Sequence, residues 1–103
     1  MRTVSPGVQL RLWVFYEEDG EAITGLTDLT VSVKDAEGNV VLASQSLIEG
    51  VSGEYSYTWD TAALQLGLRY FIYYLKGTEV LDIEEIFCDL LDDMDGLKLR
   101  RIK

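Results

Sequence analysis

The amino-acid sequence predicts an all-β protein, an antiparallel β-sandwich of about seven strands. Short runs of alternating apolar and polar side chains recur along the chain, and this period of two is typical of half-buried strands. Turns that contain glycine separate the runs at intervals of about ten residues, which suits hairpins. Strand-like segments do not alternate with helix-like ones, so a parallel α/β sheet is not expected.

The first expected strand covers residues 8–16. One face carries Val8, Leu10, Leu12, Val14 and Tyr16. The other face carries Trp13 and Phe15 beside polar residues. Since only one face of a strand can fill a single sandwich core, we expect Trp13 and Phe15 to face solvent or a partner.

The middle of the chain predicts two more strands, joined by a hairpin. In residues 29–34, leucine and valine alternate with threonine, serine and lysine. The sequence DAEGN that follows has the residues of a tight turn, and a second apolar run begins at Val40. A polar, glycine-bearing loop is expected before this hairpin, over residues 17–25.

An aromatic row follows in residues 53–59, where Tyr55, Tyr57 and Trp59 occupy every second position behind a glycine. Flat rings could stack on a sugar, but strict alternation with polar residues favours the inner face of a sandwich. Residues 68–76 then form a strand with two apolar faces, and we expect Phe71 and Tyr73 on its outer face.

The last apolar segment fits two periodicities. As a strand, residues 80–87 put Leu81, Ile83 and Phe87 on one face, which Glu85 interrupts. As a helix, the apolar residues from 83 to 94 make a continuous stripe. We expect a strand up to residue 88, then a short helix over residues 89–95 and an extended arm. The chain thus divides into a β-sandwich domain, residues 1–88, and an acidic then basic C-terminal segment, residues 89–103.

Charge is distributed unevenly along the chain, whose net charge is −9. Residues 97–103 contain four basic residues and no acid, so this arm carries +4 and the remaining residues carry −13. A negative surface repels nucleic-acid phosphates and anionic lipids, so neither nucleic acid nor a membrane is expected as a partner. The sequence describes an acidic body with a basic end.

The arm combines apolar and basic side chains: Leu97, Lys98, Leu99, Arg100, Arg101, Ile102 and Lys103. Such an arm could dock on an acidic neighbour, including the body of another copy of this chain. A terminus that only frays is the alternative interpretation.

Catalytic chemistry is not expected, and neither is a cofactor. The chain has no histidine, which removes the nucleophilic schemes that depend on it. Glu84 and Glu85 are adjacent on an expected strand and would face opposite ways. The single cysteine, Cys88, cannot form an intramolecular disulfide.

Calcium is the remaining chemical option. Four acids precede Gly96: Asp89, Asp92, Asp93 and Asp95. The calcium-loop template fails, because it would place Leu91 and Ile102 at ligand positions. An irregular site that uses these acids, or the acids of residues 17–19, stays as an alternative.

Four segments carry a resemblance to a known class of module: DLTVSVKDAEGNVV, SGEYSYTWDTAA, GLRYFIYYLKG and IEEIF. Together they resemble the small immunoglobulin-like sandwich modules of tailed-bacteriophage virion proteins and bacterial surface proteins. In those modules a hairpin is followed by a strand with alternating aromatics, a glycine–tyrosine strand and a final strand with an acid and a phenylalanine. The resemblance spans residues 26–87.

This resemblance implies a non-enzymatic virion structural protein, either a capsid decoration or cement protein or a head-tail or baseplate accessory. Its partners would be copies of itself, as a homo-oligomer, or other virion proteins. No apolar run reaches the roughly 18 residues of a membrane span, and residues 1–20 lack a signal-peptide pattern. We therefore expect assembly in the host cytoplasm. A carbohydrate-binding or host-adhesion module is the alternative, and a calcium-stiffened surface module ranks third.

Overall fold

The computed structural model describes residues 2–89, which fold into ten β-strands without a helix. The strands are β1 Arg2–Val4, β2 Gln9–Phe15, β3 Glu17–Glu18, β4 Glu21–Ala22, β5 Leu29–Asp35, β6 Val40–Ser46, β7 Ile48–Glu49, β8 Glu54–Asp60, β9 Arg69–Lys76 and β10 Glu79–Cys88. The all-β prediction is confirmed. The strand count exceeds the expected one because β1, β3, β4 and β7 are only two or three residues long, too short to give a sequence period.

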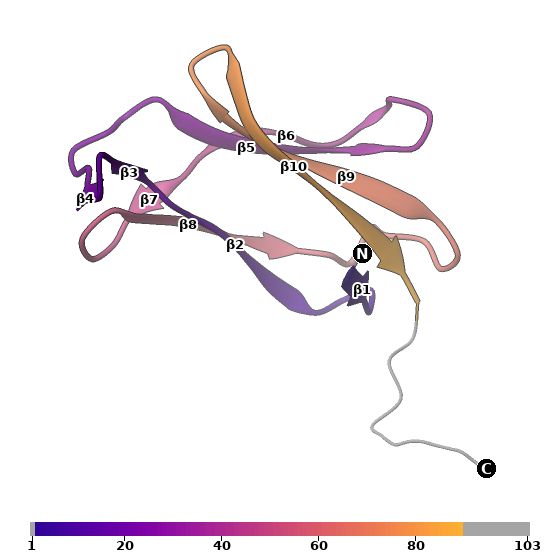
Figure 1. Ribbon diagram of the computed structural model, residues 1–103. Coiled ribbons are helices and arrows are strands. Elements are labelled where there is room, and N and C mark those ends of the chain that lie inside the picture. Colours follow the sequence, from indigo (N-terminus) through magenta and orange to yellow (C-terminus); the bar gives the residue numbers. More distant parts are fainter. Residues whose placement is uncertain (1, 90–103) are drawn as a thin grey trace.

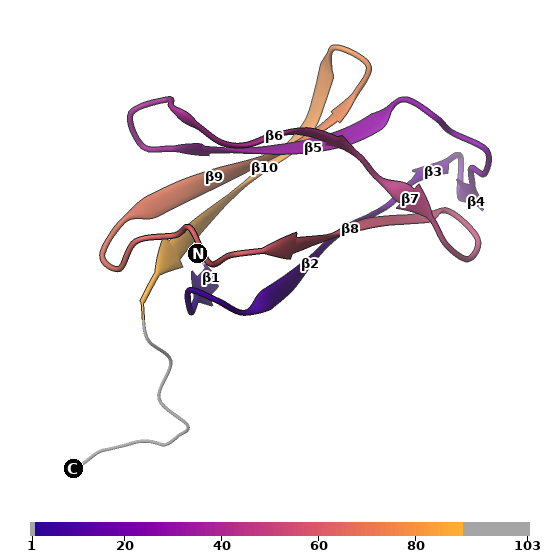
Figure 2. The ribbon, with the colours of Figure 1, turned by 180° about the vertical axis from the view of Figure 1, so that it is seen from behind.

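Two sheets form separate layers (Figures 1 and 2). The larger sheet has five strands in the order β1-β10-β9-β5-β6, and the smaller has three in the order β2-β8-β7. All neighbours in these sheets are antiparallel except β1 and β10, which run parallel. The larger sheet is therefore mixed, whereas a purely antiparallel arrangement was expected.

The hydrophobic core draws side chains from both sheets. Val31 and Ile72 come from the five-stranded sheet, and Leu12, Tyr55 and Trp59 come from the three-stranded one. All five are buried, as period-two alternation requires of an inner face. The aromatic row of β8 is thus part of the core, which excludes Tyr55 and Trp59 as a sugar platform.

Strand β10 continues to Cys88, so residues 83–88 of the segment that also fitted a helix form a strand. Its register with β9 shifts between Val80 and Asp82, which makes Leu81 the extra residue of a bulge. Leu81 packs against the core, while Ile83 and Glu85 lie on the outer face opposite Tyr73 and Phe71. Glu85 shares this outer face with Ile83 and pairs with Arg69 at 3.4 Å, so the acid that interrupted the expected apolar face does not enter the core.

The expected loop after β2 contains the small β3–β4 hairpin, which folds back onto Gly53. Gly53 has a φ of +88°, and a Cβ there would lie 2.9 Å from both the Ala22 Cβ and the Tyr16 carbonyl oxygen. Its own carbonyl accepts a hydrogen bond from the Tyr16 amide at 2.8 Å. Only glycine combines this backbone conformation with so close an approach.

The short helix expected over residues 89–95 and the basic arm of residues 97–103 lie outside the described residues, apart from Asp89. The Asp89 amide donates to the Val4 carbonyl at 3.0 Å, so β1 is held to the chain just beyond β10. Within the described part, no helix is long and apolar enough to cross a membrane.

Candidate protein-binding surfaces

The outer face of the three-stranded sheet exposes a group of apolar side chains. Trp13 is 53% exposed and Phe15 is 49% exposed, as expected for residues that alternate with the buried side of β2. Ser56 lies between Trp13 and Ile48 in the cross-strand register, and Ile48 is 69% exposed. We call Trp13, Phe15 and Ile48 the Trp13 patch.

An ion pair crosses the Trp13 patch. The Arg11 guanidinium lies 3.0 Å from the Glu54 carboxylate, and both side chains remain partly exposed. Exposed pairs of this kind contribute little to stability. Arg11 lies opposite Thr58 and Glu54 lies opposite Phe15, so the two side chains meet beside Ser56, between Trp13 and Ile48. The pair therefore places accessible polar groups within the patch, and a partner would contact them together with the apolar side chains.

A second group lies on the outer face of the five-stranded sheet. Phe71 and Tyr73 are half-buried there, and Ile83 stands directly opposite Tyr73 on β10. The Lys34 ammonium lies 5.4 Å from the centre of the Tyr73 ring, within cation–π distance. We call Phe71, Tyr73 and Ile83 the Tyr73 patch, and it is less open than the Trp13 patch because its own neighbours cover part of it.

The structure does not bring the four predicted aromatic side chains together. Trp13 and Phe15 lie on one sheet, and Phe71 and Tyr73 lie on the other, with the core residues between the two sheets. Figure 1 shows the two sheets as separate layers. Because both pairs face away from the core between these layers, they occupy opposite faces of the molecule. A flat partner could cover one patch at a time. The seven predicted arm residues, 97–103, lie outside the described part of the chain.

Sequence reasoning missed Ile48 and Ile83. Ile48 stands in a glycine-containing stretch that indicated a connection, and only its pairing with β8 places it beside Trp13. Ile83 shares its face with Leu81 in an unbroken strand, but the bulge moves Leu81 toward the core and leaves Ile83 outside. Neither position can be assigned without the cross-strand register.

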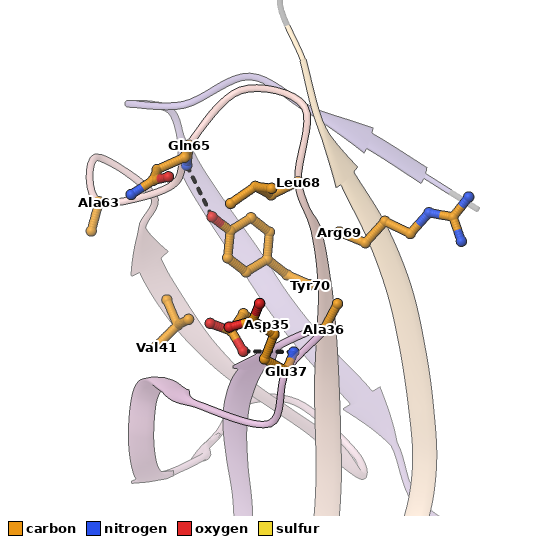
Figure 3. A pocket seen from close by; sticks show the side chains of 9 residues that line it. All are labelled: Asp35, Ala36, Glu37, Val41, Ala63, Gln65, Leu68, Arg69 and Tyr70. Carbon is orange, nitrogen blue, oxygen red and sulfur yellow. Dashed lines mark hydrogen bonds between the residues drawn. The ribbon is translucent and has the colours of Figure 1, made fainter.

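A pocket of about 360 Å³ lies where the β5–β6 turn meets the loop before β9 (Figure 3). It is lined by Asp35, Ala36, Glu37, Val41, Ala63, Gln65, Leu68, Arg69 and Tyr70. The Tyr70 hydroxyl accepts a hydrogen bond from the Gln65 amide at 3.0 Å, which fixes the loop over the pocket.

Of the two acids that line this pocket, Asp35 already has hydrogen-bond partners in its own turn. The Asp35 carboxylate accepts hydrogen bonds from the Glu37 and Asn39 amides, each at 2.9 Å. These bonds, chiefly those from Asn39, favour the charged form and lower the pKa of Asp35 below its ordinary value. The carboxylate shapes its own turn, and nothing in this arrangement resembles a positioned acid or base.

The side chains of Glu84 and Glu85 do not converge either. Glu84 lies cross-strand from buried Ile72 and pairs with Arg2 at 3.1 Å, whereas Glu85 lies opposite Phe71. The two carboxylates therefore face opposite sides of β10. Among residues 2–89, no three acid or cysteine side chains are grouped closely enough to hold a metal ion, and this range includes the acids of residues 17–19.

No family model, no curated protein and no solved structure matches this chain. The function is therefore inferred from the strand topology, the exposed patches and the sequence resemblance.

Proposed function

We propose that the chain is an immunoglobulin-like β-sandwich module and that it serves as a non-enzymatic structural component of a virion. In this proposal it acts as a capsid decoration protein or a head-tail or baseplate accessory. It binds other virion proteins or copies of itself, and the Trp13 patch is the contact surface.

The strand order supports the immunoglobulin-like part of the proposal. Immunoglobulin domains place strands B, E and D in one sheet and strands G, F, C and C′ in the other. If β2, β8 and β7 are B, E and D, the smaller sheet has this order. The run β10-β9-β5-β6 of the larger sheet then corresponds to G, F, C and C′, and β1 adds to G.

Tyr70 supports the same assignment. Immunoglobulin domains carry a tyrosine near the start of strand F whose hydroxyl bonds to the backbone a few residues upstream. Tyr70 is the second residue of β9, and its hydroxyl bonds to the Gln65 amide. In antibody domains a disulfide cysteine follows two residues later, and here that position is Ile72, which is fully buried. Apolar packing stands in place of the disulfide.

The exposed Trp13 patch is the observation that carries the binding role. Aromatic residues dominate the energetic centres of protein interfaces, and monomeric proteins seldom leave adjacent large apolar side chains open to water. The basic arm adds a second means of attachment to an acidic neighbour, and it stays a prediction from charge. The assignment to a virion rests on the sequence resemblance.

A carbohydrate-binding module is the second candidate, because an exposed tryptophan beside an Arg–Glu pair also suits stacking on a sugar. A glycan array separates the two candidates. Glycan binding by the wild-type chain that disappears in Trp13→Ala would replace the structural proposal with the adhesive one. The structural proposal predicts an array without hits, together with recovery of the chain in purified phage particles by mass spectrometry.

A further inference from the structure

Strand β2 has an open edge along its whole length. It pairs with β8 on one side, and no strand among residues 2–89 pairs with its other side. The pairing with β8 runs from Gln9 to Phe15 without a bulge. A regular edge of this kind presents a row of backbone N–H and C=O groups that can pair with another strand.

The residues whose backbone groups point outward can be identified. At one end of β2 the Val8 carbonyl accepts from the Thr61 amide, and at the other the Tyr16 amide donates to the Gly53 carbonyl. Hydrogen-bonded and non-bonded pairs alternate along an antiparallel ladder, so the even-numbered residues bond to β8. The N–H and C=O groups of Gln9, Arg11, Trp13 and Phe15 therefore face the open edge.

The other long edges are better protected than β2. Two register shifts interrupt the pairing of β6 with β5, and bulges of this kind twist an edge away from partners. The part of β10 that β1 does not cover carries four acids, Glu79, Asp82, Glu84 and Glu85, which would repel a like strand. Strand β7 has only two residues. Strand β2 is the long, regular edge, and Arg11 is its one charged residue.

We propose that β2 pairs antiparallel with β2 of a second copy of this chain, so that two three-stranded sheets join into one sheet across a twofold axis. The pairing centred on Leu12 uses all four outward-facing residues: Arg11 lies opposite Trp13 of the second copy, and Gln9 lies opposite Phe15. On the inner face, Leu10 lies opposite Val14. Apolar residues thus meet on the inner face, and on the outer face each arginine stands opposite a tryptophan ring. The Arg11 guanidinium exchanges its exposed pair with Glu54, which contributes little to stability, for a cation–π contact with that ring.

The side chains of the strand suit a second copy as the occupant. The strand carries no acid that would repel a copy of itself, and pairing about Leu12 buries Leu10 against Val14 on the inner face of an isologous twofold interface. This pairing also places two Trp13 patches side by side on one continuous outer surface. Glu84 lines a cavity at this edge together with Arg11 and Trp13. Its ion pair with Arg2 offsets its negative charge at the edge. The inference goes beyond the proposed function, because the second copy covers the β2 edge and leaves the two Trp13 patches open to another partner.

Sedimentation velocity of the full-length chain over a concentration series tests this pairing. Trp13→Lys places a lysine opposite Arg11 of the second copy, and we expect it to weaken dimerisation by about tenfold or more. Trp13→Glu removes the same ring but places an acid opposite Arg11, so it should dimerise more tightly than Trp13→Lys. Ile48→Lys is the matched control: it adds the same charge to the same patch, two strands away from the edge, and should dimerise as the wild type does.

Hydrogen exchange supplies a second readout that does not depend on any variant. The amides of Arg11 and Trp13 should become protected as the wild-type concentration rises, because they gain partners only in the dimer. A wild-type chain that stays monomeric up to about 1 mM would overturn the inference. So would a dimer that leaves these two amides unprotected, or one that Trp13→Lys and Ile48→Lys weaken equally. Particle incorporation is measured separately, so the proposed function and this pairing can fail independently.

Discussion

Tyr55 fills the core and also holds a loop. Its side chain is fully buried, and its hydroxyl donates to the Ile23 carbonyl at 2.8 Å and accepts from the Leu26 amide at 3.3 Å. Both backbone groups belong to the connection between β4 and β5. The Tyr55 hydroxyl oxygen therefore helps to fix the backbone conformation of this connection.

Tyr55→Phe should lower the free energy of unfolding by about 1–3 kcal/mol, because it leaves two backbone groups without their partner. Chemical denaturation followed by fluorescence measures the loss. Tyr57→Phe is the control on the same strand, since no hydrogen bond of the Tyr57 hydroxyl is found within residues 2–89, and its effect should be small. Equal losses in the two variants would show that the hydroxyl of Tyr55 does not stabilise the connection.

Ionisation of Tyr74 should set an alkaline limit to the stability of the protein. Burial, followed by the nearby Glu84 carboxylate, raises the pKa of Tyr74 from 10.0 to about 12, although the Arg2 guanidinium opposes the shift. A raised pKa means that the folded state favours the neutral phenol. The contribution is complete below the unfolded-state pKa and is lost as the pH rises through the folded-state pKa.

Stability should therefore fall between pH 10 and about 12, and Tyr74→Phe should flatten this decline because it removes the ionising group. Urea denaturation at a series of alkaline pH values gives the two curves. If wild type and variant lose stability in parallel over this range, Tyr74 does not control the alkaline limit.

At the scale of elements, β1 covers the end of β10. Val4 is the parallel partner of Cys88, and both side chains are buried. Burial also raises the pKa of the Cys88 thiol, which keeps it in the unreactive protonated form. The short first strand thus protects the one cysteine of the chain.

Removing residues 1–4 should make Cys88 react faster with a thiol reagent under native conditions, because β1 no longer covers it. Arg2→Ala is the control, since it breaks only an exposed ion pair and leaves β1 in place. A truncated chain that keeps the wild-type reaction rate, with an unchanged circular dichroism spectrum, would show that β1 does not cover the thiol.

The sequence predicted the strands that have a clear period of two. In β5 and β8, buried and less buried residues alternate as the sequence indicates, and the exposure of Trp13 follows from the same rule on β2. The sequence did not predict the short strands β1, β3, β4 and β7, because two or three residues are too few to show a period. For β10 the sequence fits a helix as well as a strand, and pairing with β9 decides between them.

The candidate site could be predicted only in part for the same reason. Trp13 and Phe15 are assigned to the outer face by alternation within one strand. Ile48 joins them through two successive cross-strand pairs, and the position of Ile83 depends on a bulge. These relations are set by tertiary pairing, which no local pattern encodes.

At the scale of the whole molecule, the two apolar patches lie on the outer faces of the two sheets, which Figure 2 shows as separate layers. In our account the Trp13 patch faces a partner in the particle, and the open β2 edge beside it faces a second copy. The Tyr73 patch is partly covered by its own neighbours and is not needed for either contact. The three-stranded sheet would thus bind the partners, while the outer face of the five-stranded sheet stays exposed.

The central claim is that the Trp13 patch attaches the folded chain to a phage particle. The direct measurement is quantitative mass spectrometry of purified particles, with the chain supplied as wild type, as Phe15→Ser/Ile48→Ser, or as the control Leu66→Ser/Val80→Ser. The control removes two exposed apolar side chains outside the patch, Leu66 at 52% and Val80 at 49% exposed. We predict wild type and control at a fixed ratio to the major capsid protein, and the patch variant depleted although folded. A wild-type chain absent from particles, or a patch variant incorporated as fully as the control, would contradict the account.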